Sequence, residues 1–373
     1  MIPVAKPDVG DKELAQVAEA FESGWIGLGP KVDEFEQRFG EAFNHSNVIA
    51  TNSCTNALDL AVKSLELEGT EILVPPITWI STAHAAAYNN YDIGWVDVEP
   101  GTLTMSPDSL REQIGDDTAA VIPVHYGGQP AAIDEITQIA HNYGAAVIED
   151  CAHAPGASFD GQSLGSIGDV GCFSFQATKP LTTGEGGALV TDDDEIADRA
   201  RRLSKLGVNK STHERSQGDE SKYDWYYKVT EVGYKYFMHD ISAALGLAQL
   251  DRFDGLQRQR NELADVYADM FETIDWASPL ERRPSTTHSW YNYTVLVPPA
   301  YRDDLIKHLG RNDVGATVHY MPLYKHPVFD QTPDTPVAES IWEEIVTLPM
   351  SSTFDEDDII RVVDTVRNYS RVE

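Results

Sequence analysis

The stretch GCFSFQATKPLTTGEGGALVTD, residues 171–192, places one lysine between two apolar runs. The runs 171–176 and 187–192 are strand candidates, and such runs are typical of a sheet that helices cover on both faces. Lys179 lies between them, directly before Pro180 and a glycine-rich turn. From this stretch alone a surface lysine is the simpler interpretation, so the role of Lys179 depends on the rest of the chain.

The chain around this stretch alternates strand and helix candidates from about residue 46 to residue 193. Residues 55–67 and 133–144 have apolar positions at helical spacing. Alternation of this kind predicts an α/β fold with a mostly parallel sheet flanked by helices. The other strand candidates are 71–76, 93–98, 119–126 and 145–150.

The pattern changes near residue 251, and 373 residues exceed one ordinary core. We therefore expect a large domain over 1–250, including the N-terminal segment, and a smaller α+β C-terminal domain over 251–373. The polar stretch 207–225 predicts a long loop. The smaller domain is indicated by an amphipathic stretch, a strand-like run and a helical run, at 251–274, 290–297 and 300–312.

The charge balance is strongly acidic, with 28 basic and 60 acidic residues and a net charge of −32. A nucleic-acid surface needs clustered lysine and arginine, so this class of partner is excluded. Acid runs such as 191–198 and 354–360 are most simply solvated faces, and their spread along the chain suggests a halophilic surface adapted to high salt. No apolar stretch is long enough to span a bilayer and no signal peptide is recognisable, so we expect a cytoplasmic protein. Three widely spaced cysteines argue against a disulfide framework.

Several polar residues fall where strand candidates end, which is where open α/β sheets bind ligands. Asp150 closes the run 145–150 and is either a helix cap or a ligand group. The stretch 51–58, TNSCTNAL, enters a helix with hydroxyls and amides that either cap it or bind phosphate. Ser174 lies near the end of its strand, and Trp79 alone is more simply a core aromatic.

These parts suit pyridoxal phosphate. This cofactor needs a lysine for a Schiff base, a carboxylate that keeps the pyridine nitrogen protonated, and a cradle for its phosphate. Since Pro180 restricts Lys179 to extended conformations, the lysine can reach a cofactor held at the strand ends. A nicotinamide enzyme is disfavoured because no complete G-x-G-x-x-G follows a strand. A metal site of His125, Cys151 and His153 lacks recognisable ligand spacing, so no metal is expected.

The order of the motifs closely resembles the sugar aminotransferase family of fold type I pyridoxal-phosphate enzymes, over nearly the whole chain. Within that family, ITWIST, DCAHA and GYKY look most like the enzymes that make UDP-4-amino-4-deoxy-L-arabinose or other 4-amino nucleotide sugars. The motifs are TNSCTNAL (51–58), PPITWISTAHAA (75–86), VIPVHYGGQP (121–130), VIEDCAHAPGA (147–157), FSFQATKPLTTGEGGALVT (173–191) and GYKYFMHDISAALGLAQL (233–250), with GWIGLGPKVDEFE (24–36) and VHYMPLYKHPVF (318–329).

The resemblance implies a role for each matching residue. Lys179 forms the Schiff base with the cofactor and then moves protons. Asp150 pairs with the pyridine nitrogen, His153 contacts the phenolic oxygen of the ring, and Trp79 stacks on the ring. The phosphate is held by Ser53, Cys54, Thr55 and Ser174.

The same resemblance implies a homodimer in which Lys235 reaches the cofactor phosphate of the neighbouring subunit. Many relatives have asparagine at or near this place, so Lys235 departs from the usual pattern. The tentative substrate contacts are Trp25, His319, Tyr320 and His326.

The implied reaction transfers an amino group, with glutamate the expected donor, to a keto nucleotide sugar, most simply at C4. A related pyridoxal-phosphate sugar dehydratase replaces the lysine with histidine, so Lys179 argues against that alternative. A regulator that binds the cofactor or sugar without turnover is the alternative from another class. We expect no nucleic-acid and no membrane partner.

Overall fold

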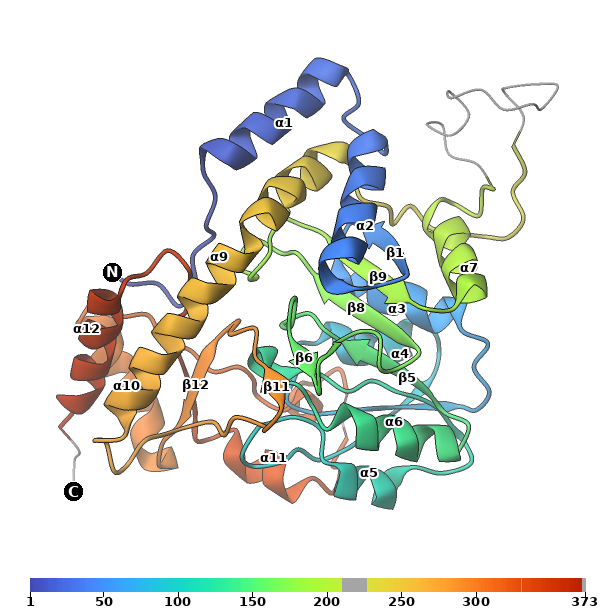
Figure 1. Cartoon of the computed structure of the whole chain (residues 1–373). Helices are drawn as coiled ribbons and strands as arrows, with labels where there is room; N and C mark the ends of the chain where they lie inside the picture. Colours follow the sequence, from blue (N-terminus) through green and yellow to red (C-terminus); the bar gives the residue numbers. More distant parts are fainter. Residues whose placement is uncertain (210–226, 330, 371–373) are drawn as a thin grey trace.

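The computed structural model describes residues 1–209, 227–329 and 331–370 (Figure 1). Most of the expected loop 207–225 therefore lies outside the described residues. None of the helices in the described ranges combines the length and the apolar character that a membrane crossing requires.

A seven-stranded sheet forms the centre of the fold, in the order β1-β9-β8-β5-β4-β2-β3. The neighbours from β8 to β3 are parallel, whereas β9 is antiparallel to both of its neighbours. The mostly parallel α/β sheet is confirmed, and each strand candidate between 71 and 192 overlaps one of its strands. These are β1 (Asn47–Thr51), β2 (Glu71–Val74), β3 (Asp92–Trp95), β4 (Thr118–Val121), β5 (Ala146–Asp150), β8 (Val170–Ser174) and β9 (Gly187–Thr191).

Helices cover both faces of this sheet because successive strand residues enter two different cores. In β1, Val48 and Ala50 pack into one core and Ile49 into the other. The first core is covered by α2 (Pro30–Phe43), α5 (Pro107–Gln113), α6 (Ile133–Asn142) and the first part of α9 (Asp240–Phe271). The second is covered by α3 (Cys54–Ser64), α4 (Ser81–Tyr88) and α7 (Asp194–Ser204). With both faces covered, the carboxyl ends of the parallel strands are the free edge for a ligand.

A second, antiparallel sheet lies in the C-terminal part of the chain, in the order β10-β12-β13. Its core also includes residues from the second half of α9 and from Ile2 near the N-terminus. The predicted smaller α+β unit is therefore present. Its elements are β10 (Ser278–Pro279), β12 (Tyr293–Leu296), α10 (Pro299–Arg311), β13 (Ile345–Leu348) and α12 (Glu356–Arg367).

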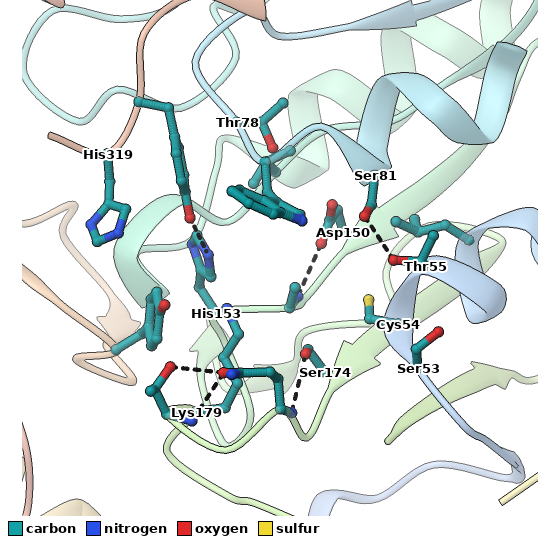
Figure 2. A pocket seen from close by; sticks show the side chains of 18 of the residues that line it. Ser53, Cys54, Thr55, Thr78, Ser81, Asp150, His153, Ser174, Lys179 and His319 are labelled. Carbon is teal, nitrogen blue, oxygen red and sulfur yellow. Dashed lines mark hydrogen bonds between the residues drawn. The ribbon is translucent and has the colours of Figure 1, made fainter. Parts of the chain in front are cut away.

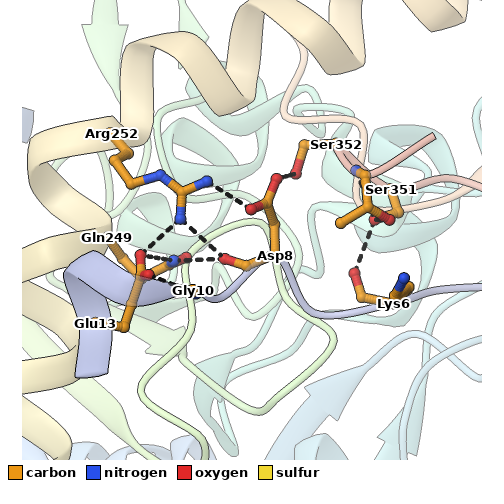
Figure 3. A network of polar contacts seen from close by, with 9 residues as sticks. Lys6, Asp8, Gly10, Glu13, Gln249, Arg252, Ser351 and Ser352 are labelled. Carbon is orange, nitrogen blue, oxygen red and sulfur yellow. Dashed lines mark hydrogen bonds and ion pairs between the residues drawn. The ribbon is translucent and has the colours of Figure 1, made fainter. Parts of the chain in front are cut away.

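The predicted domain boundary after residue 250 falls inside the continuous helix α9. Close to this point Arg252 forms ion pairs with Asp8 (2.5 Å) and with the buried Glu13 (2.7 Å) (Figure 3). These ion pairs hold the start of α1 (Asp11–Ser23) against α9. One helix therefore contributes to both cores. The division of the chain into two domains at residue 250 stays a prediction.

Two acid-rich runs of the sequence begin helices. The carboxylate of Asp193 accepts hydrogen bonds from two backbone N–H groups at the start of α7. Asp355 and Asp358 form a reciprocal capping box at the start of α12. Negative side chains satisfy free N–H groups and complement the helix dipole there, so these acids have a local structural role besides their contact with solvent.

Three two-residue strands form a small sheet that the sequence pattern did not indicate, in the order β11-β6-β7. Strands this short show no periodicity, and β11 comes from the C-terminal part of the chain. They are β6 (Ser158–Phe159), β7 (Gln162–Ser163) and β11 (Thr286–Thr287). The other short elements are α11 (Pro336–Ile341) and the 3-10 turns η1 (Tyr126–Gly128) and η2 (Leu323–Lys325).

Candidate active site

A cavity of about 540 Å³ lies where two parallel strands end. Asp150 is the last residue of β5 and Ser174 the last of β8, and both line the cavity (Figure 2). Tyr291, His319 and Tyr320 from the C-terminal unit line it as well. The two units of the fold therefore build one site, at the edge where open α/β sheets bind ligands.

Lys179 lies on the turn that follows β8. Its N–H donates to the carbonyl oxygen of Gln176 (2.9 Å), which turns the chain directly before Pro180. Its half-buried side chain lines the cavity, with Nζ 3.8 Å from the centroid of the Tyr291 ring. The structure thus places this lysine in the cavity and not on the outer surface.

Asp150 is a buried carboxylate on the cavity wall. One oxygen accepts from the hydroxyl of Thr82 (2.8 Å) and the other from the N–H of Ala152 (3.0 Å). Burial raises the pKa of Asp150, although these hydrogen bonds and the charge of Lys179 act in the opposite direction. None of the ion pairs seen within the described ranges includes Asp150. A cationic ligand atom beside it would relieve the cost of burying this charge.

His153 is a neutral histidine with a defined tautomer. Its Nδ1 accepts a hydrogen bond from the N–H of Gly127 (3.2 Å), so its own proton is on Nε2. Nε2 faces the hydroxyl of Tyr320 at 3.3 Å. Burial, with the charges of Lys179 and His319, holds the pKa of His153 well below its ordinary value. His153 therefore presents an N–H donor at the cavity wall.

The start of α3 forms another part of the wall, with Ser53, Cys54 and Thr55. Ser53 caps the helix, and its Oγ accepts from the N–H of Asn56 (3.2 Å). Within the described residues no acceptor is seen for the N–H groups of Cys54 and Thr55. Gly187 lies so close that a Cβ there would be 2.5 Å from the Cys54 nitrogen. A helix start with free N–H groups, approached by glycine, is suited to binding an anion.

Trp79 is 60% exposed and lines the cavity, so it is not a core residue. The centroid of its ring is 6.1 Å from that of Tyr320, at an interplanar angle of 53°. The indole is therefore not stacked on Tyr320, and it offers a flat apolar surface to a ligand.

The four tentative substrate residues separate into two groups. His319 and Tyr320 line the cavity, whereas Trp25 and His326 are not among the residues that line it. Burial and the charge of Lys179 lower the pKa of His319 to about 4. Lys235 is exposed, does not line the cavity, and lies beside the end of β1 in its own chain. Three of the residues named from the resemblance are thus outside the cavity of a single chain.

Tyr291 and Thr82 contact functional groups but were missed in the sequence. Tyr291 lies beside Lys179, and Thr82 donates to Asp150. The segment SWYNY around Tyr291 is rich in aromatic residues, a composition that indicates a strand and does not single out one ring. Thr82 is the last residue of the motif ITWIST, and its place in that motif was the feature of the sequence that could have identified it.

A second titratable cluster lies outside the set of residues that line the cavity. Ligand-type atoms of His125, Glu149 and Cys151 lie within 4.8 Å of one another. His125 already uses both ring nitrogens, Nε2 with Glu149 (3.0 Å) and Nδ1 with the N–H of Ala131 (3.1 Å). Glu149 also accepts from three backbone N–H groups, and burial raises the pKa of the Cys151 thiol. With the histidine and the carboxylate occupied by protein partners, the cluster is a structural network.

The cavity matches the requirements of pyridoxal phosphate. It combines a lysine, a buried carboxylate without a cationic partner among the described residues, an uncharged N–H donor, and a helix start with free N–H groups. The α/β fold and this set of side chains define a fold type I pyridoxal-phosphate enzyme.

Comparison with known proteins identifies the family. The model of the DegT/DnrJ/EryC1/StrS aminotransferase family matches residues 7–367. The spore coat polysaccharide biosynthesis protein SpsC of Bacillus subtilis is 36% identical over 98% of this chain and 96% of its own length. The sugar aminotransferase CalS13 of Micromonospora echinospora is 30% identical, with a TM-score of 0.89 over 98% of this chain and 99% of that one.

Spr1654 of Streptococcus pneumoniae is similar in structure and has been solved in a PLP form and a PMP form. In the PMP form it is 28% identical, with a TM-score of 0.92 over 98% of both chains. This chain belongs to the DegT/DnrJ/EryC1/StrS aminotransferase family. At that level it is a sugar aminotransferase that depends on pyridoxal 5'-phosphate.

Proposed function

We propose that this chain transfers an amino group from glutamate to the C4 keto carbon of a nucleotide-linked sugar. The observation that carries the proposal is the meeting of Lys179, Asp150 and the start of α3 in one cavity. The likeness of ITWIST, DCAHA and GYKY to enzymes of 4-amino nucleotide sugars supports C4 as the carbon that is aminated.

In this proposal each wall of the cavity holds one part of the cofactor. The carboxylate of Asp150 would supply the negative charge that keeps the pyridine nitrogen protonated. The Nε2–H of His153 would serve the phenolic oxygen as a donor, and Trp79 would offer its flat surface to the ring. Ser53, Cys54 and Thr55 at the start of α3 would hold the phosphate, together with Ser174 from the end of β8.

When bound, pyridoxal phosphate supplies an electron sink and carries the amino group between the two substrates. The protein moves the protons. In the first half-reaction Lys179 would accept the proton from the α-carbon of the amino donor and pass it to the cofactor carbon that takes up the amino group. In the second half-reaction it would move a proton from that carbon to the sugar carbon that is aminated. Its place on a turn directly after β8 brings the Lys179 side chain to the wall of the cavity, which supports this role. His153 is uncharged, so it supports the ring oxygen without competing for these protons.

The cofactor phosphate and the acidic nucleotide are both negatively charged, and the cavity of one chain offers them little positive charge. Among the described residues that line the cavity, Lys179 is the one lysine or arginine, and in the proposed function it is committed to the cofactor. We therefore propose a homodimer in which the partner's Lys235 reaches the cofactor phosphate. The exposure of Lys235, and its position outside its own cavity, support this assignment. A cytoplasmic location accords with a nucleotide-sugar substrate and stays a prediction.

The proposal is tested by the two half-reactions. Purified protein loaded with the cofactor is expected to change spectrum with glutamate as the cofactor takes up the amino group. A 4-keto nucleotide sugar should then restore the first spectrum and yield the 4-amino sugar, detected by mass spectrometry. Glutamine and 3-keto nucleotide sugars serve as the comparison substrates.

Borohydride trapping tests the site itself. Reduction of the holoenzyme is expected to fix the cofactor covalently on Lys179, as peptide mapping would reveal. Lys179→Ala should bind the cofactor without covalent attachment and lose both half-reactions. Attachment at another lysine, or amination by Lys179→Ala at the wild-type rate, would remove the proposed role. Turnover with a 3-keto nucleotide sugar, and none with a 4-keto one, would assign the amination to C3 in place of C4.

A further inference from the structure

The turn that carries Lys179 is held by one residue, Gln176. The backbone carbonyl of Gln176 accepts a hydrogen bond from the N–H of Lys179 (2.9 Å). Its side-chain Oε1 accepts from the N–H of Thr178 (3.0 Å) and from the Thr178 hydroxyl (2.8 Å). Gln176 and Thr178 are half-buried and both line the cavity. Three hydrogen bonds to one residue therefore fix the shape of this turn.

The orientation of the Gln176 amide follows from these bonds. A backbone N–H can only donate, so the atom that faces the N–H of Thr178 is Oε1 and not Nε2. An amide oxygen only accepts, so the hydroxyl of Thr178 uses its single hydrogen in the bond to Oε1. In any other hydrogen bond, the hydroxyl oxygen of Thr178 is then the acceptor.

Tyr291 joins this turn to the amine of Lys179. Its hydroxyl forms side-chain hydrogen bonds with Thr178 and with Lys179, and Nζ of Lys179 is 3.8 Å from the centroid of its ring. Because the hydrogen of the Thr178 hydroxyl is committed to Gln176, Tyr291 donates to Thr178, and the phenolic oxygen accepts from Nζ. A chain of hydrogen bonds thus runs from Lys179 through Tyr291 and Thr178 and ends on Oε1 of Gln176.

The ring of Tyr291 is held from the other side of the cavity. Its N–H donates to the carbonyl oxygen of Gly127 (2.9 Å), and the ring stacks on that of His153, with centroids 4.3 Å apart. Gly127 has a φ of +64°, and a Cβ there would lie 2.6 Å from Asn292 Oδ1, so this support has little freedom to move. The chain therefore connects Nζ of Lys179 to two fixed parts of the fold.

We propose that Gln176 and Thr178 are positioning residues, which hold the amine of Lys179 at the cavity wall through the hydroxyl of Tyr291 before the lysine joins the cofactor. A reaction is faster when the reacting atoms are held in reach of each other beforehand. The step concerned is the condensation of the Lys179 amine with the aldehyde of pyridoxal phosphate, which forms the Schiff base and releases water. The inference rests on the proposed function, which assigns that step to Lys179.

The test separates covalent attachment of the cofactor from its binding. Full-length protein, freed of cofactor, is mixed with pyridoxal phosphate, and samples are reduced with borohydride after increasing times. Peptide mass spectrometry then gives the fraction of Lys179 that carries the cofactor. Binding without a covalent bond is measured by titration with pyridoxamine phosphate, which has the same ring and phosphate but no aldehyde.

Two substitutions interrupt the chain at different places. Gln176→Met keeps the backbone bonds and removes Oε1, whereas Thr178→Val removes the hydroxyl and keeps the shape of the side chain. Each is expected to slow attachment to Lys179 roughly tenfold, with the affinity for pyridoxamine phosphate within about twofold of the wild type. Thr178→Ser keeps a hydroxyl and should restore the rate. The double variant should be no slower than Gln176→Met, because the two residues act in one chain.

Thr137→Val is the matched control for Thr178→Val. Thr137 lies on α6 and does not line the cavity, and its buried hydroxyl has no hydrogen-bond partner among the described residues. The same chemical change at this position should leave both the rate of attachment and the affinity for pyridoxamine phosphate unchanged.

A wild-type rate of attachment in both Gln176→Met and Thr178→Val would overturn the proposal. A slow Thr178→Ser, or an affinity for pyridoxamine phosphate that falls as much as the rate, would also overturn it, since either indicates a general change of the cavity. Thr178→Val is nearly isosteric, so it carries the test where Gln176→Met does not stay folded. Failure of the proposed function is seen separately in the wild type, where borohydride would fix the cofactor on a lysine other than Lys179.

Discussion

At the scale of single residues, Asp150 carries the clearest electrostatic prediction. Replacement by asparagine keeps the size of the side chain and an oxygen acceptor, but removes the negative charge that favours a protonated pyridine nitrogen. We expect turnover to fall at least about a hundredfold in Asp150→Asn, or ~3 kcal/mol of activation free energy. Steady-state kinetics of the holoenzyme measures this loss.

The control for Asp150→Asn is Thr82→Val, which removes the hydrogen bond to the carboxylate and leaves its charge. Its turnover should fall much less than that of Asp150→Asn. If Asp150→Asn turned over at nearly the wild-type rate, Asp150 would be reduced to a structural residue at the end of β5.

At the scale of elements, the proposed sharing of active sites between subunits depends on the segment 233–240, which carries Lys235. In its own chain this segment lies beside β1, where the N–H of Asn52 donates to the carbonyl oxygen of Tyr236 (2.7 Å). Tyr236 in turn donates to the buried Asp59 on α3 (3.0 Å). The backbone of the segment is therefore anchored within its own chain. The side chain of Lys235 is exposed and does not line the cavity of that chain.

Complementation tests the sharing of sites. Lys179→Ala and Lys235→Ala are each expected to be inactive as pure proteins. After unfolding and refolding as an equal mixture, about half of the dimers should be mixed, and each mixed dimer holds one complete site. Activity should then return to about a quarter of the wild-type value under random two-fold assembly.

The control is wild-type protein taken through the same unfolding and refolding. Activity near zero in the mixture would mean that Lys235 acts within its own chain. Full activity of Lys235→Ala alone would mean that the residue has no essential role.

At the scale of the whole molecule, the net charge of −32 predicts stabilisation by salt. Repulsion between surface carboxylates is screened over about 10 Å in 0.1 M salt and about 3 Å in 1 M salt. Screening also weakens exposed ion pairs such as Arg38–Asp251, but such pairs contribute only about 0–1 kcal/mol each. With 60 acidic and 28 basic residues, the relief of repulsion is the larger effect.

Thermal melting in a series of sodium chloride concentrations measures this effect. The midpoint of unfolding should rise steadily from 0.1 M to about 2 M salt. A midpoint that stays constant or falls would contradict a halophilic surface. Melting at fixed salt with added sucrose is the control, because sucrose stabilises compact states without screening charge.

Much of the candidate site is indicated by short stretches of sequence. Lys179, Asp150, Ser174 and Ser53 each lie at or just beyond the end of a short apolar strand, and parallel strands bring such ends to one edge of the sheet. These positions, together with the resemblance of the ordered motifs to a known family, were therefore sufficient to predict a mostly parallel sheet, the cofactor and many residues that line the cavity.

The contribution of the C-terminal unit was beyond local sequence. Tyr291 lies more than a hundred positions after Lys179 in the chain, and its ring reaches Nζ only because the two units pack around one cavity. The continuity of α9 through residue 250 is a similar case, since one amphipathic stretch serves two separate cores. Helical periodicity in such a stretch does not reveal which core each half contacts.

The amino-acid sequence by itself determined the fold class and the cofactor and indicated Lys179 and Asp150 as candidate site residues, because these depend on residue type at or just beyond the ends of neighbouring strands and on the order of the motifs. Only the tertiary structure decided that the proton of His153 is on Nε2, through the Gly127 N–H, and that Tyr291 lies beside Lys179. These properties depend on distances between residues far apart in the chain. Such distances are set by the packing of the two units, which no single stretch of sequence encodes.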